Sequence, residues 1–221
     1  MKRNLLPWQL LTLVAVLAPS LYLLYLWPQL PAQVPSHFDG MGQANDYTSR
    51  ANLWLTVLGL PLGTALLFSA VPYLDPKHRL DSNSVNFQKL RLAVVALLGA
   101  LAGFSLFAAL HPGAAAGRGL VVGAGLFLAF LGNYLTTVQP NYFVGIRTPW
   151  TLEDPTVWAR THRVGGILFC LAGLLIAGLA LVVPLAWTQR VLISMVLLTS
   201  AFCYGYSYFV FRQEERLGRT A

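Results

Sequence analysis

Six long apolar runs alternate with polar segments along the chain. They cover residues 8–27, 53–74, 92–110, 119–138, 164–187 and 191–211, and none of them contains Asp, Glu, Lys, Arg or His. Each run has 19 to 24 residues, enough for a helix rising 1.5 Å per residue to cross a hydrocarbon core of about 30 Å. The pattern predicts an all-α fold, a polytopic membrane helix bundle with six transmembrane helices.

Composition agrees with the pattern of apolar runs. Of the 221 residues, 56% are hydrophobic and only 10% are charged, whereas a soluble domain carries about a quarter charged residues. These values exclude a disordered chain, a coiled coil and a typical soluble enzyme. The formal net charge is +7, but no basic stripe or aromatic platform accompanies it, so we expect no direct nucleic-acid partner.

The distribution of basic residues predicts the orientation. The N-terminus, loops 75–91 and 139–163 and the C-terminus together hold 12 of the 15 Lys and Arg residues, and the alternate loops hold three. Cytoplasmic loops of membrane proteins are enriched in Lys and Arg. We therefore expect both termini in the cytoplasm, loop 28–52 outside and loop 139–163 inside.

Glycine and proline predict details of the helix packing. Three glycine pairs have the four-residue spacing that lets helices approach closely: Gly59/Gly63, Gly99/Gly103 and Gly119/Gly123. Ordinary helix packing is favoured over a dedicated dimer face. Pro184 is expected to kink the fifth helix, because proline removes a helical hydrogen bond.

The outer loop contains three candidate metal ligands. His37 and Asp39 are two residues apart, so their side chains point the same way in an extended segment. A turn at the following glycines would bring Asp46 back towards them. The three side chains would then hold a divalent cation with water, or they would fix turns by hydrogen bonding to the backbone. Apart from this metal, no cofactor is expected.

The inner loop predicts a helix start and several polar contacts. Asp154 followed by Pro155 is typical of an N-cap and first helical residue. A helix from Pro155 would place Trp158 and His162, four residues apart, on one face. Arg147 would pair with an anion or a partner carboxylate, or donate to backbone carbonyls of its own loop.

The same loop carries a resemblance to the SdpI family of bacterial multipass membrane proteins. The residues that carry it are Asn141, Gly145, Ile146, Arg147, Thr148, Pro149, Trp150, Thr151 and Leu152, then Val157, Trp158, Thr161, His162, Arg163, Gly165 and Gly166. The outer loop resembles a domain of unknown function that often precedes this region, through Pro35, His37, Phe38, Gly42 and Asp46. The pattern departs at Asn45, where that domain usually has proline.

The resemblance implies a division of the chain and a set of site residues. Residues 1–74 form an N-terminal two-span unit with outer loop 28–52, and 75–118 form a linker loop and third span. Residues 119–211 form an SdpI-like region with loop 139–163, and 212–221 form a short cytoplasmic tail. The expected ligand or partner residues are Asn141, Gly145, Arg147, Thr148, Pro149, Trp150, Trp158, His162 and Arg163.

The resemblance also implies a function. The namesake of the family protects its producer from a secreted toxic peptide and holds a cytoplasmic repressor at the membrane. We therefore expect a non-enzymatic immunity or signal-transducing protein of the bacterial cytoplasmic membrane. Its partners would be membrane lipids, an extracellular toxin peptide and a cytoplasmic transcriptional repressor.

Two other functions stay open. A passive or lipid-like transporter is compatible with the fold, although ion-coupled carriers normally keep ionisable residues within their spans and this chain has none there. A metal-dependent membrane enzyme would have to use His37, Asp39 and Asp46. No zinc-protease or serine-hydrolase motif supports that enzyme.

Overall fold

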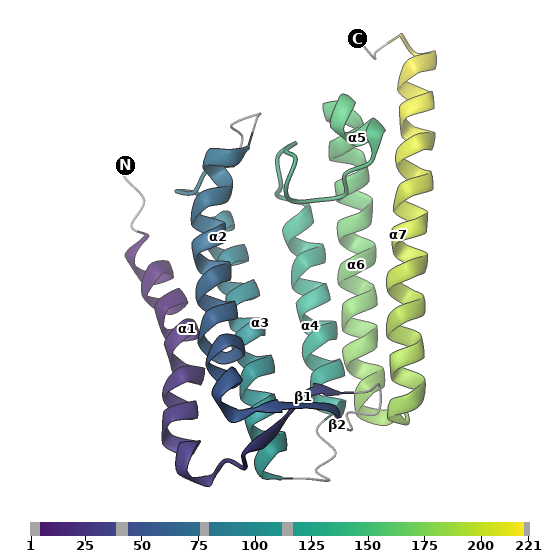
Figure 1. Cartoon of the computed structure of the whole chain (residues 1–221). Helices are drawn as coiled ribbons and strands as arrows, with labels where there is room; N and C mark the ends of the chain where they lie inside the picture. The colour runs from purple at the N-terminus through teal and green to yellow at the C-terminus, as the bar shows by residue number, and fades with distance from the viewer. Residues whose placement is uncertain (1–4, 39–43, 76–79, 112–116, 219–221) are drawn as a thin grey trace. The chain divides into compact units, whose positions relative to one another are not determined.

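The computed structural model describes residues 5–38, 44–75, 80–111 and 117–218 (Figure 1). Within these ranges, six helical segments are long and apolar enough to cross a membrane. They are Leu6–Gln29, Arg50–Leu74, Val85–Leu110, Gly117–Leu135, Pro155–Val182 and Leu185–Arg216. The predicted all-α class with six spans is confirmed, with a two-stranded sheet in addition.

The chain forms two compact units, which are described separately. Unit 1 contains Met1–Ala70 and Ser82–Leu120, and unit 2 contains Val71–Asp81 and Val121–Ala221. Helices α1 (Leu6–Leu26) and α3 (Val85–Leu110) pack against each other in unit 1. Helix α2 (Leu60–Leu74) follows a π-helical turn, Leu55–Gly59.

The core of unit 1 joins its helices to a hairpin. Strands β1 (Gln33–Phe38) and β2 (Ala44–Ser49) pair antiparallel, and β1 also contacts α3. The buried apolar cluster comprises Leu23, Leu26, Leu30, Val34, Leu53, Val57, Ala102 and Leu106. Arg50, after β2, stacks over the Trp27 ring at 5.1 Å and donates to the carbonyl oxygen of Leu30. These contacts fix the hairpin to the end of α1.

Unit 2 is built on three long helices and one short one. Helix α6 (Pro155–Val182) packs along α7 (Leu185–Arg216), and the short α5 (Pro149–Glu153) contacts both. Most of α4 (Gly117–Leu135) also belongs to this unit. Figure 1 shows α5 beside one end of α6 and α7.

The boundary between the last two spans differs from residues 188–190, which separate the apolar runs 164–187 and 191–211 in the sequence. Helix α6 ends at Val182 and α7 begins at Leu185, so those three residues lie within α7. Val183 adopts an extended conformation (φ −94°, ψ 150°) immediately before Pro184, as the bulk of a proline ring imposes on its predecessor. Pro184 therefore separates two helices, and the expectation that it kinks the fifth one is wrong.

Helices α4 and α6 approach closely through glycines spaced by seven residues. A Cβ added at Gly125 would lie 2.7 Å from the Gly173 oxygen, and one at Gly166 would lie 2.7 Å from the Gly132 oxygen. Both separations are shorter than real Cβ contacts, so backbone here packs on backbone. The seven-residue spacing in each helix keeps both glycines on one face over two turns.

The glycine pairs singled out by their four-residue spacing behave differently. At Gly63, Gly103, Gly119 and Gly123, no atom of the described residues lies within 4 Å of an added Cβ. Only Gly99 packs against a neighbouring helix, at 3.0 Å from the Ala15 oxygen. At those four positions the described residues therefore show no close packing within either unit, since the spacing does not reveal which face meets a neighbour.

Candidate functional site

The loop between α4 and α6 is organised around a buried asparagine. Asn141 is fully buried, and its Oδ1 accepts hydrogen bonds from the backbone N–H groups of Phe143 and Val144 at 2.8 and 2.7 Å. Its Nδ2 donates to the carbonyl oxygens of Gln139 and Val144. One side chain thus satisfies four backbone groups of a segment without regular structure.

A histidine and a tryptophan on α6 form hydrogen bonds with the backbone of the same loop. His162 Nε2 accepts from the Ile146 N–H, and its Nδ1 donates to the Trp158 carbonyl, both at 2.9 Å. The rings of Trp158 and His162 stack with centroids 3.9 Å apart, and Trp158 Nε1 donates to the Val138 oxygen at 2.9 Å. The prediction that Trp158 and His162 share one face of the helix is confirmed. The two hydrogen bonds of His162 are those of a neutral ring that carries its hydrogen on Nδ1.

Gly145 is required by this arrangement for two independent reasons. Its φ of +124° lies in a region that residues with a side chain rarely adopt. A Cβ there would overlap His162 Nε2 and lie 3.0 Å from Cη2 of Trp158. The glycine of the motif is therefore explained by the packing of its neighbours.

The threonines of the motif build the helix that follows. Thr148 and Thr151 form a capping box at the start of α5, and Thr151 Oγ1 also donates to the Ile146 oxygen at 2.8 Å. Trp150 packs on α7, with its ring centroid 5.1 Å from Tyr204 and 5.0 Å from Tyr208. Helix α5 therefore anchors the loop to α7.

Helix α6 begins where the sequence predicts. Asp154 Oδ1 accepts from the N–H groups of Thr156 and Val157, and Pro155 is the first helical residue. Further along, Arg160 lies 3.0 Å from the carboxylate of Glu214, whose side chain is 3% exposed. This ion pair joins α6 to the end of α7.

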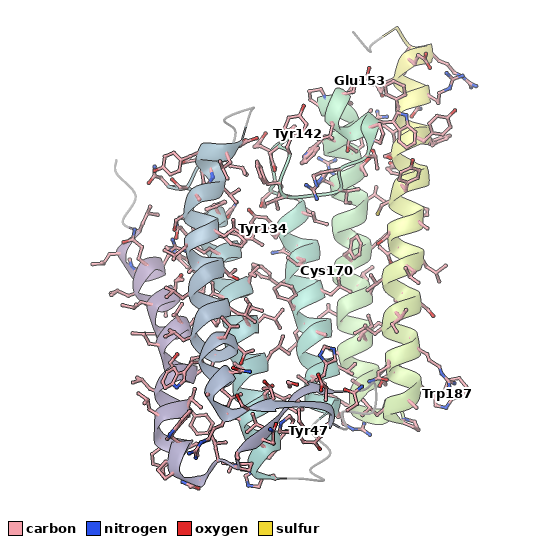
Figure 2. The ribbon with its side chains drawn as sticks, viewed as in Figure 1. Tyr47, Tyr134, Tyr142, Glu153, Cys170 and Trp187 are labelled. Carbon is pink, nitrogen blue, oxygen red and sulfur yellow. The ribbon has the colours of Figure 1, made fainter. Side chains whose placement is uncertain are left out.

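Arg147 lies on the exposed side of the loop. Its guanidinium donates to the carbonyl oxygen of Tyr142. Of the two roles left open by the sequence, the contact with a loop carbonyl is therefore present. Figure 2 shows Tyr142 and Glu153 near one end of unit 2, with Trp187 at the other end and Cys170 between.

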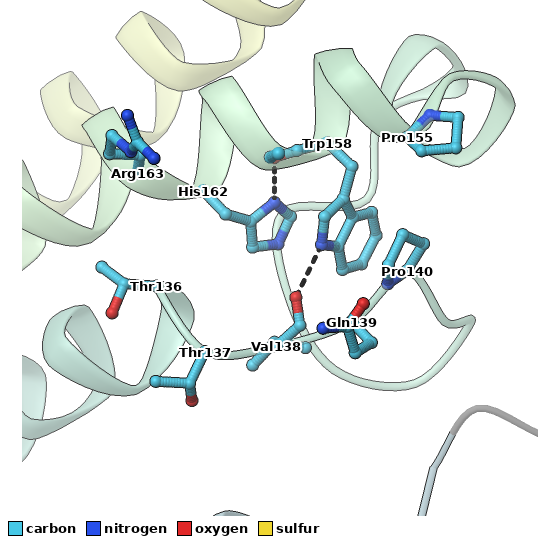
Figure 3. A pocket seen from close by; sticks show the side chains of 10 residues that line it. Thr136, Thr137, Val138, Gln139, Pro140, Pro155, Trp158, His162 and Arg163 are labelled. Atoms are coloured by element: carbon cyan, nitrogen blue, oxygen red, sulfur yellow. Dashed lines mark hydrogen bonds between the residues drawn. The ribbon is translucent and has the colours of Figure 1, made fainter.

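A pocket of about 340 Å³ lies between this loop and the first turns of α6 (Figure 3). Its walls are formed by Thr136, Thr137, Val138, Gln139, Pro140, Pro155, Trp158, Ala159, His162 and Arg163. The stacked rings of Trp158 and His162 are buried, whereas Arg163 is exposed. Among the described residues that form the wall, Arg163 is the only charged one.

The predicted binding residues thus fall into two groups. Those that are buried or fill the loop's interior hold its shape: Asn141, Gly145, Thr148, Trp150, Trp158 and His162. Those with exposed side chains are Arg147, Pro149 and Arg163. Thr151 was absent from the predicted set, although its three-residue spacing from Thr148 is the signal of a capping box.

The structure brings together two of the three candidate metal ligands of the outer loop. His37 and Asp46 are partners across the hairpin and both are exposed, while Asp39 lies outside the described residues. Asp46 Oδ1 accepts from the N–H of Tyr47, the next residue of β2, at 2.8 Å. No group of three metal-ligating side chains occurs among the described residues, and the metal site stays a prediction.

The fold and the loop define a class: a multipass helical membrane protein with an internally hydrogen-bonded polar loop between two spans. Residues 137–208 match the SdpI/YfhL protein family, and residues 14–62 match a domain of unknown function (DUF1648). The resemblance predicted from the loop motif is confirmed, and the matched segment begins just after α4 and runs through α5 and α6 into α7.

A curated relative supports the same assignment. The chain is similar to the immunity protein SdpI of Bacillus subtilis (strain 168), with 34% identity over 89 residues. The alignment covers 38% of this chain and 43% of that protein, so it spans less than half of the relative's length. No solved structure matches the chain.

Proposed function

We propose that the protein is an immunity protein of the bacterial cytoplasmic membrane, which protects the cell that carries it from a secreted toxic peptide. The observation that carries this proposal is the similarity to an immunity protein, together with a family match that covers the loop, α5, α6 and most of α7. Both termini and the loop between α4 and α6 would face the cytoplasm. The hairpin β1–β2 would face outward, where an extracellular peptide is met.

The division of the loop into buried and exposed residues supports a recognition role for its surface. Backbone groups of the loop are satisfied by Asn141, Trp158 and His162, so its shape does not depend on a partner. A preformed surface loses less conformational freedom on binding than a disordered one. The exposed Arg147 and Pro149 would then be the contacts for a cytoplasmic repressor.

The proposal is tested by protection from the peptide. The chain is expressed in a toxin-sensitive bacterium that lacks its own immunity gene, and cells are challenged with the peptide against which the family's namesake protects. Arg147→Gln removes an exposed guanidinium whose hydrogen bond is to a loop carbonyl. Arg190→Gln is the matched control, since that guanidinium stacks over Trp187 on α7, away from the loop.

The possible results distinguish the immunity function of the protein from the role of Arg147 in it. Survival with the wild type at normal membrane abundance supports immunity, and death of well-expressing cells contradicts it for that peptide. Loss of protection in Arg147→Gln but not in Arg190→Gln supports the loop surface as the working face. Equal protection by both variants would remove Arg147 from the site while leaving the immunity function intact.

A second measurement is the distribution of the repressor between the cytosolic and membrane fractions. When a DNA-binding repressor is encoded beside the gene, we expect it to move from the cytosolic to the membrane fraction after the peptide is added. Arg147→Gln is expected to prevent that movement, because a planar guanidinium pairs with two carboxylate oxygens at once and glutamine does not. A repressor that stays cytosolic with the wild type would contradict sequestration.

A further inference from the structure

The pocket shown in Figure 3 has hydrogen-bond donors that the loop does not use. Trp158 Nε1 and both ring nitrogens of His162 are already paired with backbone groups. By contrast, the guanidinium of Arg163 and the side-chain amide of Gln139 have no hydrogen-bond partner within the described part of the chain. Two donor groups, one of them cationic, therefore lie on the wall of one concavity.

The remaining polar groups of the wall are acceptors. The hydroxyls of Thr136 and Thr137 donate to the carbonyl oxygens of Asn133 and Tyr134, both at 2.8 Å. Each hydroxyl oxygen keeps lone pairs that accept a hydrogen bond. The pocket thus combines a cation and an amide with two acceptors, and none of the described residues that line it has a carboxylate. These donors and acceptors together fit a ligand that is an anion and also carries hydroxyl groups.

The place of the pocket along both helices indicates where that anion comes from. Helix α4 ends at Leu135, and the pocket wall begins at the next residue, Thr136. On α6, Arg163 is the last charged residue before an uncharged run that continues to Val182. Both spans therefore change from apolar to polar at this level, which is where lipid headgroups lie and where basic residues meet their phosphates.

We propose that this pocket binds a phosphate group, with Arg163 and Gln139 donating to its oxygens and the hydroxyls of Thr136 and Thr137 accepting from a hydroxylated ester substituent. The phosphate is carried by a lipid headgroup or is free in the cytosol. Arginine is suited to it because its fork matches two phosphate oxygens. The volume of about 340 Å³ lies within the range of small-molecule sites. The inference is independent of the immunity function.

The test is a titration of the purified full chain in a neutral detergent, followed by native mass spectrometry and calorimetry. The three probes are dioctanoyl phosphatidylglycerol, glycerol 3-phosphate and inorganic phosphate. Arg163→Gln removes the cation, and Ala159→Leu fills the pocket from an exposed wall position without changing charge. Arg190→Gln is the control, because it removes the same charge at the other end of unit 2.

We expect phosphatidylglycerol to bind the wild type and Arg190→Gln equally, and to bind the other two variants at least about tenfold more weakly. Binding of the lipid alone identifies a headgroup site, and binding of all three probes identifies a site for free phosphate as well. Binding of no probe overturns the proposal. Binding that persists in Ala159→Leu, or falls equally in Arg190→Gln, also overturns it. Thermal unfolding of each variant checks that the fold is kept.

Discussion

Gly145→Ala is the substitution whose effect the structure defines most sharply. The residue has a φ of +124°, and holding a side-chain-bearing residue in such a region costs on the order of 1–3 kcal/mol. The new Cβ would overlap His162 Nε2, which accepts the Ile146 N–H at 2.9 Å. Breaking that part-buried bond leaves the buried His162 ring without its donor, at a further cost of about 1–3 kcal/mol.

The two costs together predict a destabilisation of roughly 2–6 kcal/mol. For a chain of this size, each kcal/mol corresponds to about 2–4 °C in the unfolding midpoint. We therefore expect thermal unfolding in detergent to begin at least about 4 °C lower. Trypsin gives a local readout, because displacement of the loop should expose the bond after Arg147, which lies two residues from Gly145.

The matched control is Gly178→Ala, on α6. No atom of the described residues lies within 4 Å of a Cβ at Gly178, and its φ is not in the left-handed region. Alanine there should change stability by less than about 1 kcal/mol, in the stabilising direction, because alanine favours the helix over glycine. Equal midpoints and equal trypsin cleavage for the two variants would refute the packing argument.

Two further predictions rest on single contacts, and a third tests the proposed orientation. Gly173→Ala should destabilise the chain by about 1–3 kcal/mol in thermal unfolding, because its Cβ would overlap the backbone of α4, whereas Gly178→Ala should not. Trp158→Phe should cost about 1–3 kcal/mol in the same assay, since the Val138 oxygen loses its 2.9 Å donor; an unchanged midpoint would contradict this. With Cys170 and Cys203 replaced by serine, a cysteine at Ser36 should react with a membrane-impermeant maleimide in whole cells; protection in intact cells and labelling after lysis would reverse the proposed orientation.

The spans could be predicted because each one depends on local sequence alone. Length and lack of charge identify a membrane-crossing helix whatever its neighbours are. The start of α6 was equally local, since Asp154 and Pro155 supply the cap and the first turn themselves. The sequence places the break before α7 at residues 188–190, a few residues too late, because the apolar run continues through Pro184. Only the backbone effect of that proline ends α6 earlier.

The packing of α4 on α6 could not be predicted from spacing. Glycines four apart occur where no neighbour approaches, and the glycines that do pack are seven apart, such as Gly125 and Gly132. Which face of a helix meets a neighbour depends on contacts distant in sequence. The same holds for Trp150, whose partners Tyr204 and Tyr208 lie more than fifty residues away on α7.

The roles of the residues within the loop motif are hard to assign from the sequence for a different reason. The resemblance of the motif to a known family places Asn141, Trp158 and His162 among the expected ligand or partner residues. The structure uses them to pair the backbone groups of the loop. Sequence alone does not separate a side chain that binds a ligand from one that replaces the hydrogen bonds of missing secondary structure.

This distinction determines how the function should be tested. A nonhelical segment next to a membrane needs internal partners for its N–H and carbonyl groups, since lipid supplies none. Most of the motif is accounted for by that need, so replacing Asn141 or His162 would abolish any function by disordering the loop. A loss of activity becomes informative only where the side chain is exposed and the loop keeps its bonds without it. Among the predicted residues, Arg147, Pro149 and Arg163 meet the condition of exposure, so these are the positions at which a substitution tests the proposed site.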